Sequence, residues 1–372
     1  MKTNINRNKI GKIGLILLST VSLLSITACG TGETSTRQVV EKSGKKITVM
    51  DNTMESVYTK LKLEGIDKVE GVRGMDWLSE DTLVVDKENK EMPPITVEGE
   101  KRYPHHFYLR ELSTGVETPL KEGEKSLGFA LLSPDKKHVF YKETYEATGI
   151  GYIMNLETGV SVKTGDAEFM TTEGEWSDNE HVIFPNMEGN IVKVDLKGNS
   201  EIAVDTGVSY VHNVVQSGNK IYYIAHEDSQ LIAYDTESKQ SAVLQKDIMW
   251  AIPSPDGSQL ALVKRTAPTE MTLFLCDNAG NEQSKLASGT QVFGTSWSPD
   301  GKLLAYTTTN ENGNENRLFI TTIDTGEQTP ISNDMQASDK LRWSPSGKKL
   351  LTSTAVLKDN TYQFIAYIIK LS

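Results

Sequence analysis

Trp297-Ser298-Pro299-Asp300-Gly301-Lys302 stands directly before the apolar run Leu303-Leu304-Ala305-Tyr306, and this combination decides the fold. The chain repeats it as Trp343-Ser344-Pro345-Ser346-Gly347-Lys348. Serine and proline favour the start of a tight turn, and glycine suits a later position where φ is positive. Short apolar runs rich in Val, Ile, Tyr and Phe favour strands over helices. Each copy therefore predicts a turn that leads into a strand.

Copies of this pattern recur along most of the chain. They begin at seven anchor positions, which are Trp77, Leu132, Trp176, Gln216, Pro253, Trp297 and Trp343. The spacings run from 37 to 55 residues, with a mean of about 44. Self-similarity at this period is typical of propeller blades with four strands each. The sequence predicts an all-β fold, a β-propeller of seven blades, with six or eight left open because two units are degenerate.

The seventh unit lacks a fourth strand before the chain reaches Ser372. Upstream of the first anchor, β-like segments occur at Lys46–Met50 and Val57–Leu63. We expect one of these segments to complete the last blade, which would close the ring and remove two exposed sheet edges. This interpretation assigns residues 45–372 to a single propeller domain.

The W-S-P-D-G-K motifs resemble the TolB-like propeller repeat, a relative of the WD repeat, over roughly residues 70–372. The resemblance implies a ring of blades around a central channel. The chain has no room for the separate α/β domain of TolB proteins, so we do not expect their partnership with the lipoprotein Pal. Four tryptophans match the hallmark and are expected to pack between blades: Trp77, Trp176, Trp297 and Trp343.

The N-terminus predicts an export signal. Basic residues precede an apolar run from Ile13 to Ile26, which is too short for a comfortable membrane span. Ile26-Thr27-Ala28-Cys29 resembles the lipobox of bacterial lipoproteins. That family cleaves residues 1–28 and attaches a diacylglyceryl group to Cys29. The resemblance implies membrane attachment through Cys29 and, in a Gram-positive cell, a place on the outer face of the cytoplasmic membrane. The alternative is a plain secretory signal with a chance cysteine.

The segment that follows reads as a connection to the propeller. Residues 29–44 are mostly small and polar after the cysteine and are typical of a flexible tether. Cys276 lies in the apolar run Leu273–Cys276, where a small buried hydrophobe is expected.

Composition and motifs disfavour several functions. The net charge is −11, which argues against a nucleic-acid partner. The two cysteines do not form a CxxC pair, so they indicate neither a zinc site nor a disulfide framework. No HExxH, P-loop or EF-hand pattern is present, so no catalytic residue, metal or cofactor is predicted. His105 and His106 are adjacent in a predicted strand, where their side chains would point to opposite faces and chelate poorly.

Two features are candidates for recognition. The first unit carries a charged insertion, Lys87–Tyr103, which predicts a projecting loop. The innermost strands should line the channel, and their last residues form a candidate site at its mouth. The members that carry charge, an imidazole or an indole are Asp76, Glu175, His212, Trp250 and Arg342. Trp250 stands outside the repeat hallmark, so inter-blade packing does not by itself account for it.

The sequence therefore favours a non-enzymatic, lipid-anchored binding module at the cell envelope, with an envelope protein or a wall polymer as partner. Two alternatives stay open. An envelope lyase or hydrolase would use the channel, with Glu175, His212 and Arg342 as its nearest acid, base and cation. A ligand sensor would use the same scaffold and report to a membrane partner.

Overall fold

The computed structural model describes residues 37–42, 45–50 and 61–372, apart from residues 98, 226, 311–315, 334, 336, 338 and 359–360. The chain divides into a unit at Met1–Thr59 and a unit at Lys60–Ser372. In the first unit, β1 (Arg37–Lys42) pairs antiparallel with β2 (Lys45–Met50). The described part of the second unit consists of strands, turns and loops and contains no helix.

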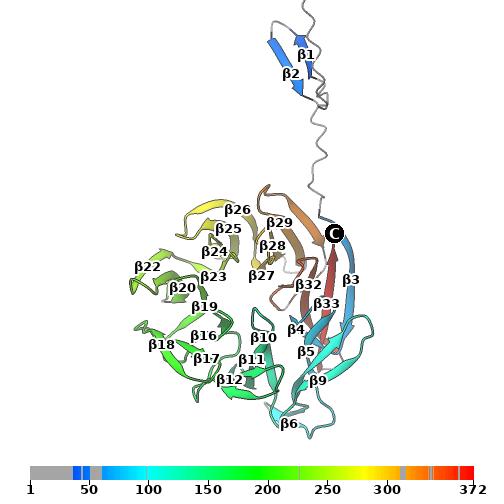
Figure 1. Ribbon diagram of the computed structural model, residues 1–372, viewed down its shortest axis with the longest axis vertical. Helices are drawn as coiled ribbons and strands as arrows, with labels where there is room; N and C mark the ends of the chain where they lie inside the picture. The colour runs from blue at the N-terminus through cyan, green and yellow to red at the C-terminus, as the bar shows by residue number, and fades with distance from the viewer. Residues whose placement is uncertain are drawn as a thin grey trace, which may run out of the picture. The chain divides into compact units, whose positions relative to one another are not determined.

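Seven four-stranded antiparallel sheets form a ring, which confirms the predicted seven-bladed propeller (Figure 1). From the channel outward, blade 1 consists of β4 (Arg73–Trp77), β5 (Thr82–Glu88), β8 (His105–Glu111) and β9 (Glu117–Lys121), and blade 2 of β10 (Leu127–Leu132), β11 (His138–Tyr145), β12 (Thr148–Asn155) and β13 (Ser161–Lys163). Blade 3 consists of β15 (Glu175–Trp176), β16 (His181–Pro185), β17 (Ile191–Asp195) and β18 (Ser200–Val204), and blade 4 of β19 (Val211–Ser217), β20 (Lys220–Ala225), β21 (Gln230–Asp235) and β22 (Gln240–Gln245). The short strand β14 (Phe169–Met170) adds to blade 2 by pairing with β12.

The last three blades follow the same order. Blade 5 consists of β23 (Ile248–Pro253), β24 (Gln259–Ala267), β25 (Glu270–Asp277) and β26 (Glu282–Gly289), and blade 6 of β27 (Gln291–Trp297), β28 (Leu303–Thr309), β29 (Asn316–Thr322) and β30 (Gln328–Ser332). Blade 7 consists of β31 (Arg342–Trp343), β32 (Lys349–Lys358), β33 (Thr361–Leu371) and β3 (Leu63–Glu70).

An N-terminal strand closes blade 7, as predicted, but its position differs from the two expected segments. The outer strand is Leu63–Glu70, which pairs antiparallel with β33 from Leu63↔Leu371 to Glu70↔Ile365. It therefore begins where the second expected segment, Val57–Leu63, ends. Leu-Glu-Gly-Ile-Asp-Lys-Val-Glu is too polar to stand out by hydrophobicity, because only one edge and one side of an outermost strand are covered.

The serine of the first turn explains why the motif makes this turn. Ser298 Oγ donates to Asp300 Oδ1 at 2.6 Å and accepts from Leu303 N at 2.9 Å, and Ser298 itself is fully buried. Gly301 N donates to Ser298 O at 2.9 Å with a φ of 71°, which confirms the positive φ predicted at the glycine. Ser133, Ser254 and Ser344 repeat the contact to the strand that follows. We call the face of the ring that carries these four serine turns the turn face.

The hydrophobic core lies between neighbouring blades. In blades 1 and 2, for example, Val84 and Phe107 pack with Val139 and Tyr141 in one cluster. The second strand of each blade is buried on both faces over at least four residues, and it is mostly apolar there, as in Leu260–Val263. Burial on both faces fixes each blade against two neighbours and gives a rigid frame for the channel.

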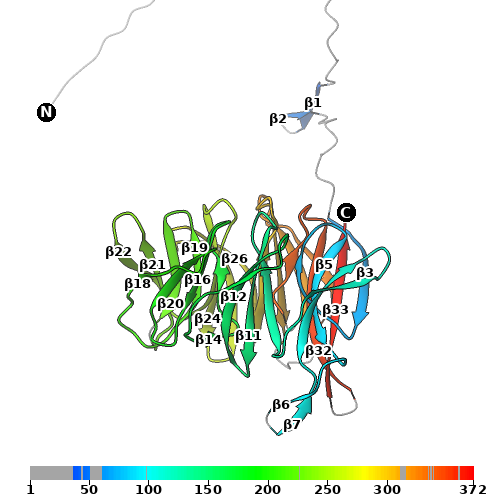
Figure 2. The same cartoon turned by 60° about the horizontal axis from the view of Figure 1, so that its bottom comes forward.

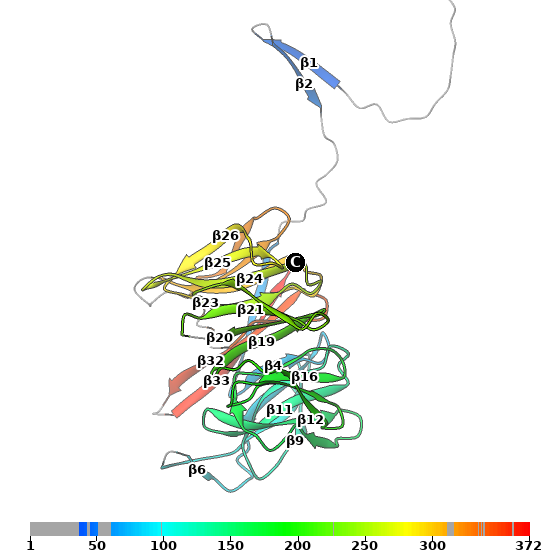
Figure 3. The same ribbon diagram turned by 90° about the vertical axis from the view of Figure 1, so that its left-hand side faces the viewer.

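The predicted insertion of blade 1, Lys87–Tyr103, contains a small hairpin in which β6 (Ile95–Val97) pairs antiparallel with β7 (Glu100–Arg102). Figures 2 and 3 show this hairpin projecting beyond the ring. It joins β5 to β8, so it lies on the face opposite the turn face, as does the far end of the β32–β33 hairpin (Figure 2).

Candidate functional site

A cavity of about 520 Å³ lies along the innermost strands of five blades. Its volume falls within the range of about 300–1,000 Å³ typical of small-molecule sites. Its lining also includes Pro134, Ser254 and Pro255 of the first turns, so the cavity reaches the turn face. The side chains able to bind a ligand by charge, hydrogen bond or ring contact are Glu175, Trp176, Asn213, Gln216, Ser217, Trp250, Ser254, Phe293, Thr295, Ser296, Lys340 and Arg342.

Trp250 supplies the apolar wall of this cavity from blade 5. The indole is half-buried and packs on the cluster that contains Val263 and Leu273. The pairing of β23 with β24 shifts register between Ile248 and Trp250, so a bulge sits directly before the tryptophan. Bulges re-aim side chains next to functional sites. Trp250 thus serves both as core packing and as cavity wall.

An ion pair crosses the channel at this level. Lys340 Nζ lies 2.8 Å from Glu175 Oε1, although Glu175 belongs to blade 3 and Lys340 precedes the first strand of blade 7. Burial alone would raise the pKa of Glu175, but the charges of Lys340 and Arg342 outweigh burial and lower it to about 2. Glu175 is therefore a carboxylate at neutral pH, and its charge offsets that of Lys340.

Arg342 is a second cation of this cavity, and the structure describes no acid in direct contact with it. Among the described residues, its guanidinium makes no ion pair or hydrogen bond. Thr295 also lines the cavity; it is 9% exposed, and its Oγ1 is buried with no hydrogen-bond partner within the described residues. A buried unpaired hydroxyl costs about 1–3 kcal/mol and marks a place where a partner is missing.

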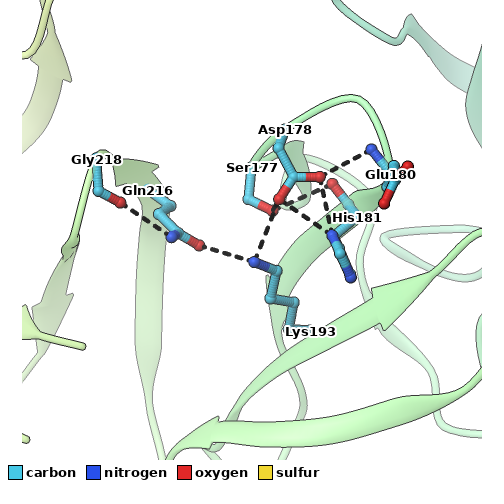
Figure 4. Close-up of polar contacts among 7 residues, drawn as sticks. All are labelled: Ser177, Asp178, Glu180, His181, Lys193, Gln216 and Gly218. Atoms are coloured by element: carbon cyan, nitrogen blue, oxygen red, sulfur yellow. Dashed lines mark hydrogen bonds and ion pairs between the residues drawn. The ribbon is translucent and has the colours of Figure 1, made fainter. Parts of the chain in front are cut away.

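A polar network holds the rim of the cavity in place (Figure 4). Lys193 Nζ contacts Asp178 Oδ2 at 3.3 Å and Gln216 Oε1 at 3.5 Å, and Gln216 Nε2 donates to Gly218 O at 3.1 Å. Burial opposes ionisation of Asp178, but hydrogen bonds from Glu180 N and His181 outweigh it and lower the pKa of the carboxyl. The amide of Gln216 is thus fixed from both ends beside the cavity.

The structure brings three of the sequence-predicted candidates to the cavity and leaves two outside. Glu175, Trp250 and Arg342 line it together. His212 is outside the lining, because Asn213 adopts a φ of 52° in a bulge and takes the place facing the cavity. Asp76 is a buried structural link, whose Oδ2 accepts from Leu132 N of the next blade at 2.9 Å.

His212 is held in a largely buried position. Burial lowers the pKa of its imidazole, and its Nδ1 has no hydrogen-bond partner in the described part of the chain. The ring lies 5.3 Å from that of Tyr210. Glu175, His212 and Arg342 are therefore not brought together into one acid, base and cation group around this cavity.

Sequence reasoning missed a buried lysine near the channel. Lys142 on β11 is 3% exposed, and its Nζ lies 4.9 Å from the ring centroid of Phe140, 5.4 Å from that of Phe129 and 5.7 Å from that of Phe169. Burial lowers the pKa of Lys142 to about 7. Burial also raises the pKa of Glu173, whose Oε2 accepts from Asn213 N at 3.0 Å. A lysine directly after the apolar run Val139–Tyr141 of a predicted inner strand was the available signal.

A second ion pair missed by sequence reasoning joins blades 1 and 7. Arg73 makes two hydrogen bonds to Asp339, at 2.8 and 2.5 Å, and its guanidinium lies between the rings of Phe129 and Phe364. Asp339 and Lys340 both lie shortly before the anchor Trp343. Aligning the seven anchors position by position would have placed these charges beside the channel.

The adjacent histidines have separate hydrogen-bond partners. His105 Nδ1 lies 2.5 Å from Asp86 Oδ1, and His106 is fully buried with Nδ1 3.0 Å from Asn89 Nδ2. The described residues contain no group of three or more His, Cys, Asp or Glu side chains placed to hold a metal ion. Cys276 is fully buried, as predicted, and burial raises the pKa of its thiol to about 12.

The expected export signal and lipid site lie outside the described residues, since residues 1–36 are not among them. The predicted tether at residues 29–44 is described only at β1, Arg37–Lys42. No helix in the described part of the chain is long and apolar enough to cross a membrane.

Comparison with known proteins gives similarity in fold. No model of a known protein family matches the chain, and no curated protein matches its sequence. A solved oligogalacturonate lyase in complex with manganese is similar with a TM-score of 0.59 and 14% identity, over 91% of this chain and 96% of that chain. The oligogalacturonate lyase of Vibrio parahaemolyticus is similar with a TM-score of 0.59 and 13% identity, over 84% of this chain and 98% of that chain. TolB of Acinetobacter baumannii has a TM-score of 0.47 and 17% identity, over 68% of this chain and 64% of that chain. At these identities the similarity is one of propeller fold.

Proposed function

We propose that this chain is a lipid-anchored binding module of the cell envelope and that its ligand enters the channel cavity from the turn face. The observation that carries the proposal is the cavity itself, with Trp250 as an apolar wall and Arg342 as a cation that makes no ion pair with any acid the structure describes. A rigid concave site with a few convergent polar groups is the usual form of a ligand site. The partner is a wall polymer or an envelope protein that presents a suitable group.

The entry point of the chain agrees with this role. Lys62 and Ser372 exchange backbone hydrogen bonds of 3.0 Å at the start of β3, and this end of the strand lies on the turn face. A chain anchored at Cys29 would then have about 30 residues before the propeller, with the β1–β2 hairpin among them, enough to reach neighbours near the membrane. Tethering raises the effective concentration of the module, so modest affinity suffices.

Site-specific crosslinking in cells tests where the ligand binds. A photoreactive benzoylphenylalanine in place of Gln216, at the cavity rim, should capture a partner in chains that carry the native Cys29. The matched control places the same group at Tyr362, which is 69% exposed on the opposite face. Capture from position 362 and not from position 216 would contradict the proposal.

The anchor is tested separately. Cys29→Ala should move the protein from the membrane fraction to the soluble extracytoplasmic fraction, since a diacylglyceryl group cannot form without the thiol. If the variant stays with the membrane, the lipid attachment is wrong, whereas the cavity proposal is unaffected.

An enzyme of the same channel is the second candidate. The observation in its favour is that burial displaces the pKa values of Lys142 and Glu173 toward neutrality from opposite sides, as acid and base catalysis requires, although neither side chain lines the cavity. Against it, Glu175 stays ionised at neutral pH and pairs with Lys340. The similarity to lyases is a similarity of fold, so only observed turnover of an envelope polysaccharide, abolished by Lys142→Met, would favour this candidate.

A further inference from the structure

Three features of the channel cavity bear on the chemistry of its ligand. One is a flat indole, and the other two are a guanidinium with no ion pair and a buried hydroxyl with no hydrogen bond within the described part of the chain. They belong to Trp250, Arg342 and Thr295, which come from three different blades and line one cavity. Since no single strand places them together, the ring itself assembles this set.

The charge of the cavity favours an anion. Three charged side chains line it, Glu175, Lys340 and Arg342. Glu175 forms its ion pair with Lys340, and the guanidinium of Arg342, whose charge also acts on Glu175, makes no hydrogen bond or ion pair among the described residues. A guanidinium binds a carboxylate or phosphate through two parallel hydrogen bonds, and these are among the stronger pairings available to a ligand. The cationic site stands out because the whole chain carries a net charge of −11.

The remaining lining favours a hydroxylated ring. Trp250 offers an apolar face, whereas Gln216, Ser217 and Ser296 offer amide and hydroxyl groups around it. A saccharide ring has this composition, with an apolar face and hydroxyls at its edge. The buried Oγ1 of Thr295 has no partner among the described residues and could reach such a hydroxyl only after its side chain rotates toward the cavity.

We infer that the cavity binds an acidic saccharide, whose carboxylate or phosphate pairs with Arg342 and whose ring packs on Trp250. This inference rests on the proposed binding function and narrows it to a ligand class. In the free protein, the Glu175–Lys340 pair keeps a second cation occupied. Removing the charge of Glu175 releases Lys340 for the ligand and strengthens binding, whereas removing the charge of Arg342 weakens it.

The test measures calorimetric binding of three matched disaccharides to the full chain purified in detergent. The probes are cellobiose, its 6′-carboxylate cellobiouronic acid, and cellobiose 6′-phosphate. We expect at least one acidic probe to bind tenfold or more tighter than cellobiose, and the preferred acid tells carboxylate from phosphate. Equal binding of the acidic and neutral probes, or binding of none, overturns the inference. Capture from position 216 in cells would then still support the binding module.

Charge variants of similar size give the second readout. Arg342→Gln should reduce the affinity for the acidic probe at least tenfold and leave that for cellobiose unchanged, whereas Glu175→Gln should raise acid affinity several-fold. Arg342→Lys keeps the charge but loses the two parallel hydrogen bonds of the guanidinium. Its affinity for the acidic probe should therefore lie between that of Arg342→Gln and that of the native chain. Thermal unfolding of each variant shows whether it is folded. A loss that is equal for both probes, or two charge variants that change affinity in the same direction, would overturn the inference.

Discussion

The indole Nε1 of Trp77 donates a hydrogen bond to the backbone carbonyl of Arg342 at 3.0 Å, although the two residues are 265 positions apart in the chain. The bond joins blade 1 to blade 7, so it spans the seam where the ring closes. The other three motif tryptophans make the same bond to the preceding blade, at the carbonyls of Leu131, Ile252 and Ser296. The predicted packing of the four tryptophans between blades is confirmed, and each also makes a hydrogen bond to the preceding blade. The seam between blades 7 and 1 therefore has the same tryptophan contact as the other three interfaces.

Trp77→Phe should destabilise the propeller by about 1–3 kcal/mol, because it leaves the buried side of the Arg342 carbonyl without its donor and opens space in a fully buried site. Chemical denaturation followed by circular dichroism measures this loss. Trp343→Phe, which removes the equivalent bond inside the ring, is the matched control and should cost a similar amount. A seam variant with no loss beside a costly control would show that the closure does not depend on this bond.

Deletion of residues 1–70 should prevent stable closure. It removes β3 and leaves the outer edge of β33 without a partner along its whole pairing, from Ile365 to Leu371. An exposed edge strand pairs with other chains, so we expect oligomers or aggregates in size-exclusion chromatography. Deletion of residues 1–60 keeps β3 and should remain monodisperse, with a cooperative melt. If both deletions behave alike, β3 is dispensable.

The turn motif was enough to predict the fold, because its serine, proline and glycine each have a fixed local role. Ser298 bonds to positions two and five residues ahead, so the signal is contained within one short stretch. The position of β3 could not be predicted in the same way. Its pairing with β33 joins opposite ends of the chain, and its exposed side chains, such as those of Glu64 and Lys68, carry no strand pattern.

The candidate site was predictable where position in the repeat decides it. Glu175 and Arg342 directly precede their anchors and Trp250 lies three residues before its own, so all three fall on channel-lining strands. His212 was misplaced relative to the cavity because a bulge with a left-handed Asn213 re-aims the strand. Contacts across the ring, such as that of Glu175 with Lys340, depend on the relative rotation of distant blades, which no local pattern encodes.

Asp339→Asn should destabilise the ring by about 3 kcal/mol, because it leaves the Arg73 guanidinium between two aromatic rings without its counter-ion. The substitution preserves shape, so the loss reports charge. Arg73→Gln and the double variant complete a mutant cycle, measured by urea unfolding. The double variant should be less destabilised than the sum of the two single variants, whereas strict additivity would mean that the pair is not coupled.

Lys142→Met should raise stability at pH 6 and flatten its dependence on pH above 7. The pKa of Lys142 falls from 10.5 to about 7 on folding, so between these values the unfolded chain binds more protons than the folded one. The free energy of unfolding of the native protein should therefore rise with pH across this window, by about 2 kcal/mol from pH 7 to 9 relative to the variant. Below pH 7 the amine is charged in both states, and the cost of burying it is present in full. Urea unfolding at pH 6, 7, 8 and 9 measures the difference, with Lys137→Met as the control, since the side chain of Lys137 is 75% exposed. Parallel curves for the native chain and Lys142→Met would contradict the burial of a titrating amine among Phe129, Phe140 and Phe169.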